Sequence, residues 1–261
     1  MYGSGESERI CGALFSGLQR ESFVVQTKYY LLPKAQTVLH PKTAPLRALQ
    51  DSLERMKLDY VDVYIVHGHI HLQFVPTIAK SMAECVDKGF AKCIGVANYA
   101  VSEMLHMKEE LAKYGVLLAL NQCEYSVLRR LPEVEGLISA CEENGIVFQG
   151  YSSLAQGRLT GKYTKENPPP STYRFSNYDM QDLEPVLGVL RSIAAERGVS
   201  VSAVALNYSM SRGVCPLAGI RMEEQARENC GALGWRLSEE EIRRIDGVSF
   251  KGYATELWQH G

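Results

Sequence analysis

The stretch VDVYIVH at residues 61–67 is mostly apolar and ends in a histidine. It is the segment from which we predict the fold of this 261-residue chain. A short run rich in valine and isoleucine is typical of a parallel strand that is covered on both faces. Runs of the same kind recur along the chain on both sides of it. We predict six strands, at Phe23–Thr27, Val61–Val66, Lys92–Ala97, Leu117–Asn121, Ile146–Gly150 and Val214–Leu217.

Longer amphipathic stretches separate the predicted strands. They predict helices at Ser7–Arg20, Pro45–Lys57, Pro76–Lys88, Val101–Lys113, Pro132–Asn144, Asp182–Arg197, Val201–Ser211 and Glu223–Leu233. A last short helix is expected to begin at Ser238, where a capping box reaches Glu241. The regular alternation of strand and helix indicates an α/β fold with a parallel sheet.

The composition is typical of a soluble globular domain, with 46% hydrophobic and 22% charged residues. One α/β barrel uses about 250 residues, so we expect a single domain over residues 1–261. The net charge of -2 and the absence of basic runs argue against nucleic acid and membrane partners. No secretory signal or membrane span is visible. The seven scattered cysteines favour reduced thiols in a cytoplasmic protein.

Polar residues collect at or just past the carboxyl ends of five predicted strands. They are Lys28, His67, Asn98, Gln122 and Tyr151. In a (β/α) barrel the loops of several strands converge at that end, and active sites are built there. Each residue alone is typical of a solvated, capping or core position. Five together predict a functional rim.

Ordered motifs around these residues resemble the aldo-keto reductase family over almost the whole chain. The matching segments are YGSGESE at 2–8, QTK at 26–28, DVYIVH at 62–67, GVANY at 95–99, NQCEYS at 121–126, YSSLAQGRLTGKY at 151–163, and PLAGIR at 216–221 with Gln225, Glu228 and Asn229. The resemblance implies a (β/α)8 TIM barrel that binds NADPH and no metal. It further implies reduction of an aldehyde or ketone, possibly a biosynthetic intermediate, to an alcohol, or the reverse oxidation.

The resemblance also implies three catalytic residues. Tyr2 matches the family's proton donor, Lys28 the lysine that lowers the pKa of that tyrosine, and His67 the histidine that orients the substrate carbonyl. These residue types suit the chemistry, because hydride transfer places negative charge on the carbonyl oxygen. The site therefore needs a proton donor, with positive or hydrogen-bonding groups around that oxygen. An ammonium beside a phenol favours the phenolate and lowers the phenol's pKa.

The cofactor positions follow from the same resemblance. Asn98 and Gln122 would bind the carboxamide of the nicotinamide, and Tyr151 would stack on its ring. The pyrophosphate segment comprises Ser152, Ser153, Leu154, Gln156, Gly157, Arg158 and Gly161. The adenosine end comprises Gly219, Ile220, Arg221, Gln225, Glu228 and Asn229. A guanidinium at Arg221 suits a 2′-phosphate, which favours NADP over NAD.

The sequence departs from the family pattern at its start. The family places an aspartate five residues before the catalytic tyrosine, whereas only Met1 precedes Tyr2. The first strand, first helix and second strand of the family are also missing from the predicted elements. We therefore expect an N-terminally incomplete barrel with two bare sheet edges. Ala97 replaces a common serine, and Gly68 replaces a common aromatic residue.

Two other functions stay open from the sequence. The chain could be a catalytically impaired, NADPH-binding regulatory or scaffold protein. It could also be a metal-dependent barrel hydrolase, with His67, His69 and His71 as ligands. The proline-rich loop at 166–172 is typical of an active-site lid, and Tyr173 and Phe175 after it are candidate substrate-binding residues together with His67. The sequence predicts neither the particular substrate nor the oligomeric state.

Overall fold

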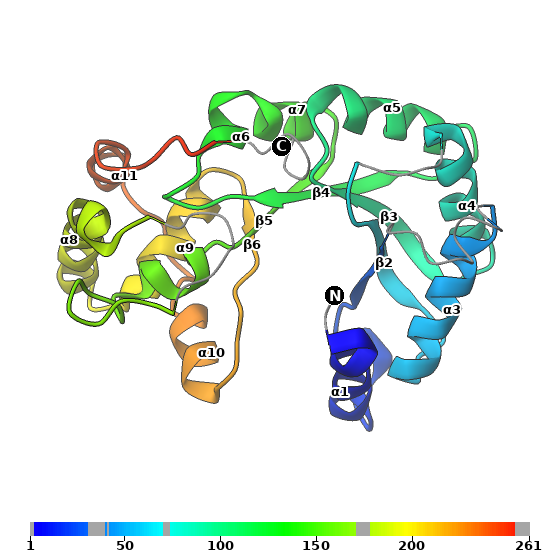
Figure 1. Ribbon diagram of the computed structural model, residues 1–261, viewed down its shortest axis with the longest axis horizontal. Coiled ribbons are helices and arrows are strands. Elements are labelled where there is room, and N and C mark those ends of the chain that lie inside the picture. Colours follow the sequence, from blue (N-terminus) through cyan, green and yellow to red (C-terminus); the bar gives the residue numbers. More distant parts are fainter. Residues whose placement is uncertain (1–2, 31–39, 41, 70–73, 171–177, 254–261) are drawn as a thin grey trace. The chain divides into compact units, whose positions relative to one another are not determined.

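The computed structural model describes residues 3–30, 40, 42–69, 74–170 and 178–253 of the chain (Figure 1). Four residues singled out from the sequence, namely Tyr2, His71, Tyr173 and Phe175, lie outside the described residues. Contacts along the chain divide it into two compact units, which are taken separately below. Unit 1 comprises the described residues up to Asn121, and unit 2 comprises those from Gln122 onward. The single-domain expectation stays a prediction.

Six strands occur in the described residues, and their hydrogen-bonded order follows the chain from β1 to β6. They are β1 (Gln26–Tyr29), β2 (Val61–Val66), β3 (Ala91–Ala97), β4 (Leu118–Glu124), β5 (Val147–Tyr151) and β6 (Cys215–Pro216). All six predictions were right about the place, and β2 was right at both ends. β6 is only two residues long, shorter than predicted, although the Leu217 N–H beyond it still donates to the Gly150 carbonyl of β5 at 2.7 Å.

Two strand boundaries differ from the prediction in a way that changes the site. β1 begins at Gln26 and not at Phe23, and it ends at Tyr29 and not at Thr27, so it contains Lys28. The Phe23 ring stacks on Phe15 at 4.3 Å, and the Val25 N–H donates to the Asp62 carboxylate, so of Val25 only the carbonyl bonds to the backbone of β2. β4 continues to Glu124 and therefore contains Gln122.

Unit 1 consists of β1 to β3, the first part of β4 and the helices that cover them. The helices are α1 (Glu6–Phe15), α3 (Ala44–Met56), α4 (Val75–Asp87) and α5 (Val101–Ala112), with short 3-10 turns at Gly3–Gly5 and Arg20–Ser22. α3 packs on β1 and α4 on β3 (Figure 1). Lys28 lies opposite Ile65 in the parallel β1–β2 pair, and Val66 lies opposite Val96 in the next pair. α1 ends five residues before the predicted Arg20.

The amino end of β2 in unit 1 is fastened by one carboxylate. Asp62 accepts hydrogen bonds from Arg20 at 2.7 Å and from the Val25 N–H at 2.8 Å, and Lys92 lies 3.0 Å from its other oxygen. Burial opposes ionisation of this carboxyl, but these three donors outweigh it and lower its pKa. Asp62 therefore joins the chain before β1 to β2 and β3, at the end of β2 remote from His67.

Unit 2 continues from β4 through β5 and β6 and carries the remaining helices. These are α6 (Leu131–Val134), α7 (Leu137–Glu143), α8 (Met180–Arg197), α9 (Val201–Ser211), α10 (Glu223–Cys230) and α11 (Glu239–Asp246), with a 3-10 segment η3 (Ala155–Thr160). The single helix predicted over 132–144 is wrong. It is divided into α6 and α7 by Gly136, which adopts a φ of 79° that a helix cannot continue.

Other helix ends in unit 2 agree more closely with the sequence. α9 has the predicted bounds. The capping box before α11 is confirmed, because the Ser238 hydroxyl accepts from the Glu241 N–H while the Ser238 N–H donates to the Glu241 carboxylate at 2.7 Å. α10 ends at Cys230, three residues before the predicted Leu233. No helix in the described ranges is both long and apolar enough to cross a membrane.

Candidate functional site

The catalytic pair predicted in unit 1 comes from neighbouring strands. Lys28 is the third residue of β1, and His67 directly follows β2. The backbone N–H of His67 donates to the Tyr29 carbonyl at 3.0 Å, so the hydrogen bonding between the two strands extends to the histidine. Because both strands are parallel, Lys28 and His67 lie toward the same end of this part of the sheet.

The imidazole of His67 is buried and electrically neutral near pH 7. Its residue is only 8% exposed, and an edge-on contact with the Tyr30 ring has a centroid separation of 5.5 Å. Burial, followed by the positive charge of Lys28, lowers the pKa of His67 to about 4. A neutral imidazole has one N–H that can donate a hydrogen bond and one nitrogen that can accept. It can therefore polarise a carbonyl oxygen without carrying a charge.

Asn98, the predicted carboxamide ligand of unit 1, occupies a strained turn after β3. Its φ of 61° is in the left-handed region, and its side chain is buried. The Asn98 carbonyl oxygen lies 3.2 Å from His69 Nδ1, and the next carbonyl, that of Tyr99, accepts from Asn121 Nδ2 at 2.9 Å. The turn is therefore held by side chains from the chain segments on either side of β3.

The metal hypothesis needs several ligating side chains around the histidine run. A carbonyl oxygen can only accept, so the contact with Asn98 uses the Nδ1–H of His69 and leaves the lone pair on Nε2. Within the described part of the chain, no group of three or more His, Cys, Asp or Glu side chains could hold a metal ion. His71, the third histidine of the motif, lies outside the described residues.

In unit 2 the predicted nicotinamide residues lie on adjacent strands. Gln122 is buried in β4, and its Nε2 donates to Gln149 Oε1 in β5 at 2.9 Å. Tyr151 is the last residue of β5, and its carbonyl accepts from the Tyr125 N–H at 3.1 Å. The contact with Gln149 restrains the position of the Gln122 amide between the two strands.

The segment after β5 has an unusual backbone. Ser152, Ala155 and Gln156 have φ values of 57°, 45° and 57°, and Gly157 follows with a φ of 92°. For a residue with a Cβ this conformation costs about 1–2 kcal/mol, and such strain is concentrated at functional sites. The N–H groups of Ala155 and Gly157 are used inside the segment, where they donate to the carbonyls of Ser152 and Leu154 at 2.7 Å and 2.8 Å.

Arg158 adds a cation to this segment. It is 3% exposed, and burial lowers its pKa without depriving it of its charge at neutral pH. Ser153 is buried as well and donates from its hydroxyl to the Gly150 carbonyl at 2.8 Å. Gly161 ends the segment with a φ of 78°, and a Cβ there would lie 3.3 Å from Val201 at the start of α9. The positive charge of the Arg158 guanidinium suits a pyrophosphate.

The predicted adenosine end is in the same unit and packs on the same helix. η3, β6 and α10 all contact α9. An apolar cluster of Ala203, Leu206 and Ala232 joins Leu154 of the pyrophosphate segment to Ala218, which precedes Gly219. Residues about 65 positions apart along the chain are therefore fixed to one support.

Side chains around α10 offer several polar contacts. The Arg221 N–H donates to Gln225 Oε1 at 2.8 Å, while the Arg221 guanidinium is exposed, as are Gly219, Ile220 and Glu228. Asn229 Nδ2 is a buried donor with no hydrogen-bond partner among the described residues. A buried amide donor without a partner is costly and suits a ring nitrogen of an adenine. The donor set of unit 2 thus fits an anionic dinucleotide.

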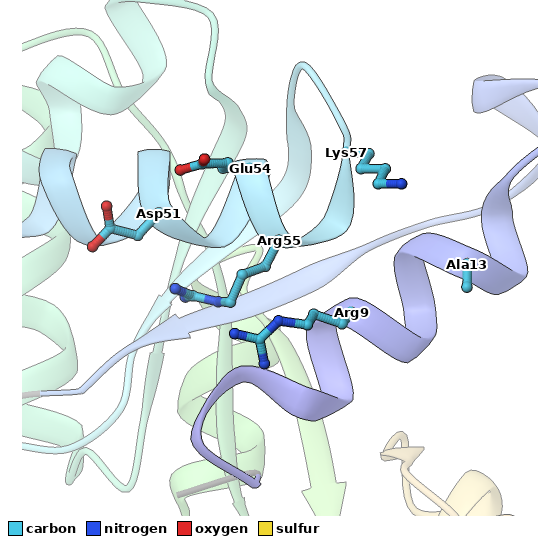
Figure 2. Close-up of a pocket in the computed structure, with 6 residues that line it drawn as sticks. All are labelled: Arg9, Ala13, Asp51, Glu54, Arg55 and Lys57. Carbon is cyan, nitrogen blue, oxygen red and sulfur yellow. The ribbon is translucent and has the colours of Figure 1, made fainter.

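A separate hollow in unit 1 contains none of the predicted site residues. Figure 2 shows its lining, which is Arg9, Ala13, Asp51, Glu54, Arg55 and Lys57 from α1 and the end of α3. Arg55 donates to Glu8 at 2.6 Å, and Arg9 pairs with Glu6 at 3.3 Å. Because acidic and basic groups are mixed here and these arginines are paired, the hollow is a surface feature of the α1–α3 contact.

Sequence reasoning missed the residues that support the site. Tyr30 against His67, Gln149 against Gln122, and Asn121 and His69 at the Asn98 turn received no supporting role from the sequence. Asn121 belongs to the quoted motif NQCEYS, and His69 belongs to the histidine run, but neither pattern indicates that the side chain supports the Asn98 turn. Tyr178, three residues after the candidate Phe175, packs on Phe250 with a ring-centroid separation of 4.6 Å.

Comparisons with known proteins show the family of this chain and its fold. The sequence profile of the Aldo/keto reductase family matches residues 1–249. The chloroplastic pyridoxal reductase of Arabidopsis thaliana is 30% identical, over 93% of this chain and 68% of that protein. The NADH-specific methylglyoxal reductase of Escherichia coli K12 is 31% identical, over 91% and 78% respectively. A solved thermostable aldo-keto reductase, bound to the inhibitor epalrestat, is 26% identical with a TM-score of 0.76, over 95% and 79%. The predicted α/β fold of TIM-barrel type is confirmed.

Proposed function

Because this chain belongs to the aldo/keto reductase family, we propose that it is an NADPH-dependent reductase that converts a small aldehyde or ketone to an alcohol. The observation that carries the proposal is the pair of Lys28 and His67. A buried, neutral imidazole in the field of an ammonium, at the ends of adjacent strands, suits an oxygen that becomes negative during the reaction.

Each residue of the proposed catalytic set has one task. His67 donates a hydrogen bond to the substrate carbonyl oxygen and thereby orients it. Tyr2 delivers the proton to that oxygen, and the Lys28 ammonium makes this easier by favouring the phenolate that is left behind. Bound NADPH supplies the hydride. The His67 imidazole and the Lys28 ammonium lie where negative charge develops during the reaction. They therefore lower the barrier more than they strengthen substrate binding.

We assign each part of the cofactor to the residues that match the family's cofactor-binding motifs. Asn98 and Gln122 would bind the carboxamide and Tyr151 would stack on the nicotinamide, so that one face of the ring meets the substrate. The pyrophosphate would be held by polar backbone and side-chain groups of the segment after β5, with the Arg158 guanidinium as its cation; the segment comprises Ser152, Ser153, Leu154, Gln156, Gly157, Arg158 and Gly161. Arg221 would bind the 2′-phosphate, and Gln225, Glu228 and Asn229 the adenine.

The preference for NADPH over NADH rests on Arg221. A relative is named as an NADH-specific reductase, so family membership alone does not decide the cofactor. We expect wild-type protein to bind NADPH more tightly than NADH, and Arg221→Ala to remove most of this difference while NADH binding changes little. Equal binding of the two cofactors by the wild type would contradict the assignment.

The substrate class is tested by turnover. We expect the purified chain to oxidise NADPH with one or more members of a panel that includes methylglyoxal and pyridoxal, the compounds in the names of two relatives. His67→Ala and Lys28→Met should each lower kcat by about a hundredfold or more. His106→Ala, on the exposed face of α5, is the matched control. NADPH binding without turnover of any carbonyl would instead identify a regulatory or scaffold protein.

A further inference from the structure

Two consecutive carbonyl oxygens after β3 are each held by a side chain from an adjacent segment of unit 1. His69 Nδ1, from the loop after β2, lies 3.2 Å from the Asn98 carbonyl oxygen, and Asn121 Nδ2, from β4, donates to the Tyr99 carbonyl at 2.9 Å. Strands β2 and β4 are the neighbours of β3 on its two sides. The turn that carries Asn98 is therefore fastened from both directions.

The backbone of Asn98 makes these contacts important. Its φ of 61° is a conformation that asparagine tolerates better than most residues, but at a cost. The direction of its side chain depends on both φ and ψ, because rotation about N–Cα or Cα–C turns Cβ and the whole carboxamide relative to the adjoining peptide planes. A hydrogen bond to the carbonyl of the same residue restrains the adjoining peptide plane, and with it the direction of the carboxamide.

We propose that His69 is a positioning residue for Asn98, and through it for the nicotinamide end of the cofactor. The inference rests on the proposed function in that Asn98 is the carboxamide ligand. His69 acts as the Nδ1–H tautomer, since the carbonyl oxygen can only accept. The second histidine of the His67–Gly68–His69 run thus supports the cofactor site, while the first faces the substrate.

Loss of the His69 side chain should weaken binding of the nicotinamide end of the cofactor and leave binding of the adenosine end unchanged. His69→Leu removes the donor, and the loss of one hydrogen bond corresponds to a dissociation constant about fivefold larger. We expect that increase for NADPH, measured by quenching of intrinsic fluorescence without any carbonyl substrate. Binding of adenosine 2′,5′-bisphosphate, which has no nicotinamide, should not change, as measured by calorimetry.

Two further variants separate positioning from stability. His69→Asn places an amide N–H near the position of Nδ1 and should restore most of the NADPH affinity. The double variant His69→Leu with Asn98→Ala should bind NADPH no more weakly than Asn98→Ala alone, because His69 acts only through Asn98. His106→Leu is the control for loss of a histidine elsewhere in unit 1, and thermal unfolding of each variant reports on folding.

The outcomes are distinct. If Asn98→Ala weakens NADPH binding but His69→Leu does not, the positioning role of His69 is wrong and the proposed function stands. The same conclusion follows if His69→Leu weakens NADPH and adenosine 2′,5′-bisphosphate equally. If Asn98→Ala leaves NADPH binding unchanged, both the carboxamide assignment and the role of His69 are wrong.

Discussion

His67 is joined to the strand of Lys28 by its own backbone, because its N–H donates at 3.0 Å to the carbonyl of Tyr29, the residue that follows Lys28. The pair therefore keeps its spacing as long as β1 and β2 remain paired. Burial and the Lys28 charge together hold the histidine neutral. This relationship can be measured directly, without knowledge of the substrate.

We predict that His67 titrates near pH 4, as its pKa of about 4 requires, and that Lys28→Met raises this pKa toward the ordinary value of about 6.5. The folded protein thus binds this proton less readily than the unfolded chain does. The associated stability is complete above about pH 6.5 and falls as the pH decreases from there to about 4. Nuclear magnetic resonance of the imidazole provides the test. Lys92→Met, at the opposite end of the strands, should leave the titration unchanged, and a His67 pKa near 6.5 in the wild type would refute the prediction.

Asp62→Asn should destabilise unit 1 by about 2 kcal/mol, since it weakens hydrogen bonds that Arg20, Lys92 and the Val25 N–H make to a carboxylate. The loss should appear in the midpoint of urea unfolding. Glu84→Gln, which weakens the exposed pair with Lys88, is the control and should change stability by less than about 0.5 kcal/mol. Equal effects of the two substitutions would show that Asp62 does not fasten β2.

Glycine substitution at two left-handed positions should separate strain from function. Lys57 ends α3 with a φ of 56°, and Lys57→Gly should stabilise the fold by about 1 kcal/mol with no effect on NADPH binding. Asn98→Gly relieves a similar strain but removes the carboxamide, so we expect NADPH to bind about tenfold more weakly. Thermal unfolding and NADPH titration of the two variants provide the comparison. Unchanged NADPH affinity in Asn98→Gly would contradict the assigned role.

Two helical glycines should respond in opposite directions to alanine. A Cβ at Gly12 in α1 would lie 2.5 Å from the Met56 carbonyl oxygen, so Gly12→Ala should force α1 away from α3 and cost about 2 kcal/mol. A Cβ at Gly188 in α8 meets no atom within 4 Å, and Gly188→Ala should stabilise by up to about 1 kcal/mol through helix propensity. Chemical unfolding distinguishes them. A neutral Gly12→Ala would mean that the α1–α3 approach is not tight.

The fold was largely readable from the sequence because its signals are local. The bounds of β2 and α9 and the capping box at Ser238 depend on residues within a few positions of one another. The helix predicted over 132–144 was wrong because apolar spacing continued through Gly136, whose φ of 79° interrupts the helix. Asp62 was visible as part of a motif, but its pairing with Arg20, 42 residues away, was not.

The sequence by itself determined the order of strands and helices, the family, and the positions at which Lys28, His67, Asn98 and Gln122 stand near strand ends. Only the tertiary structure decided what surrounds each of them. Burial and a neighbouring charge set the protonation of His67, and the carbonyl of Asn98 receives its partner from a loop 29 residues earlier in the chain. Such contacts join residues far apart in the sequence, and they form only when separate strands and loops pack against one another.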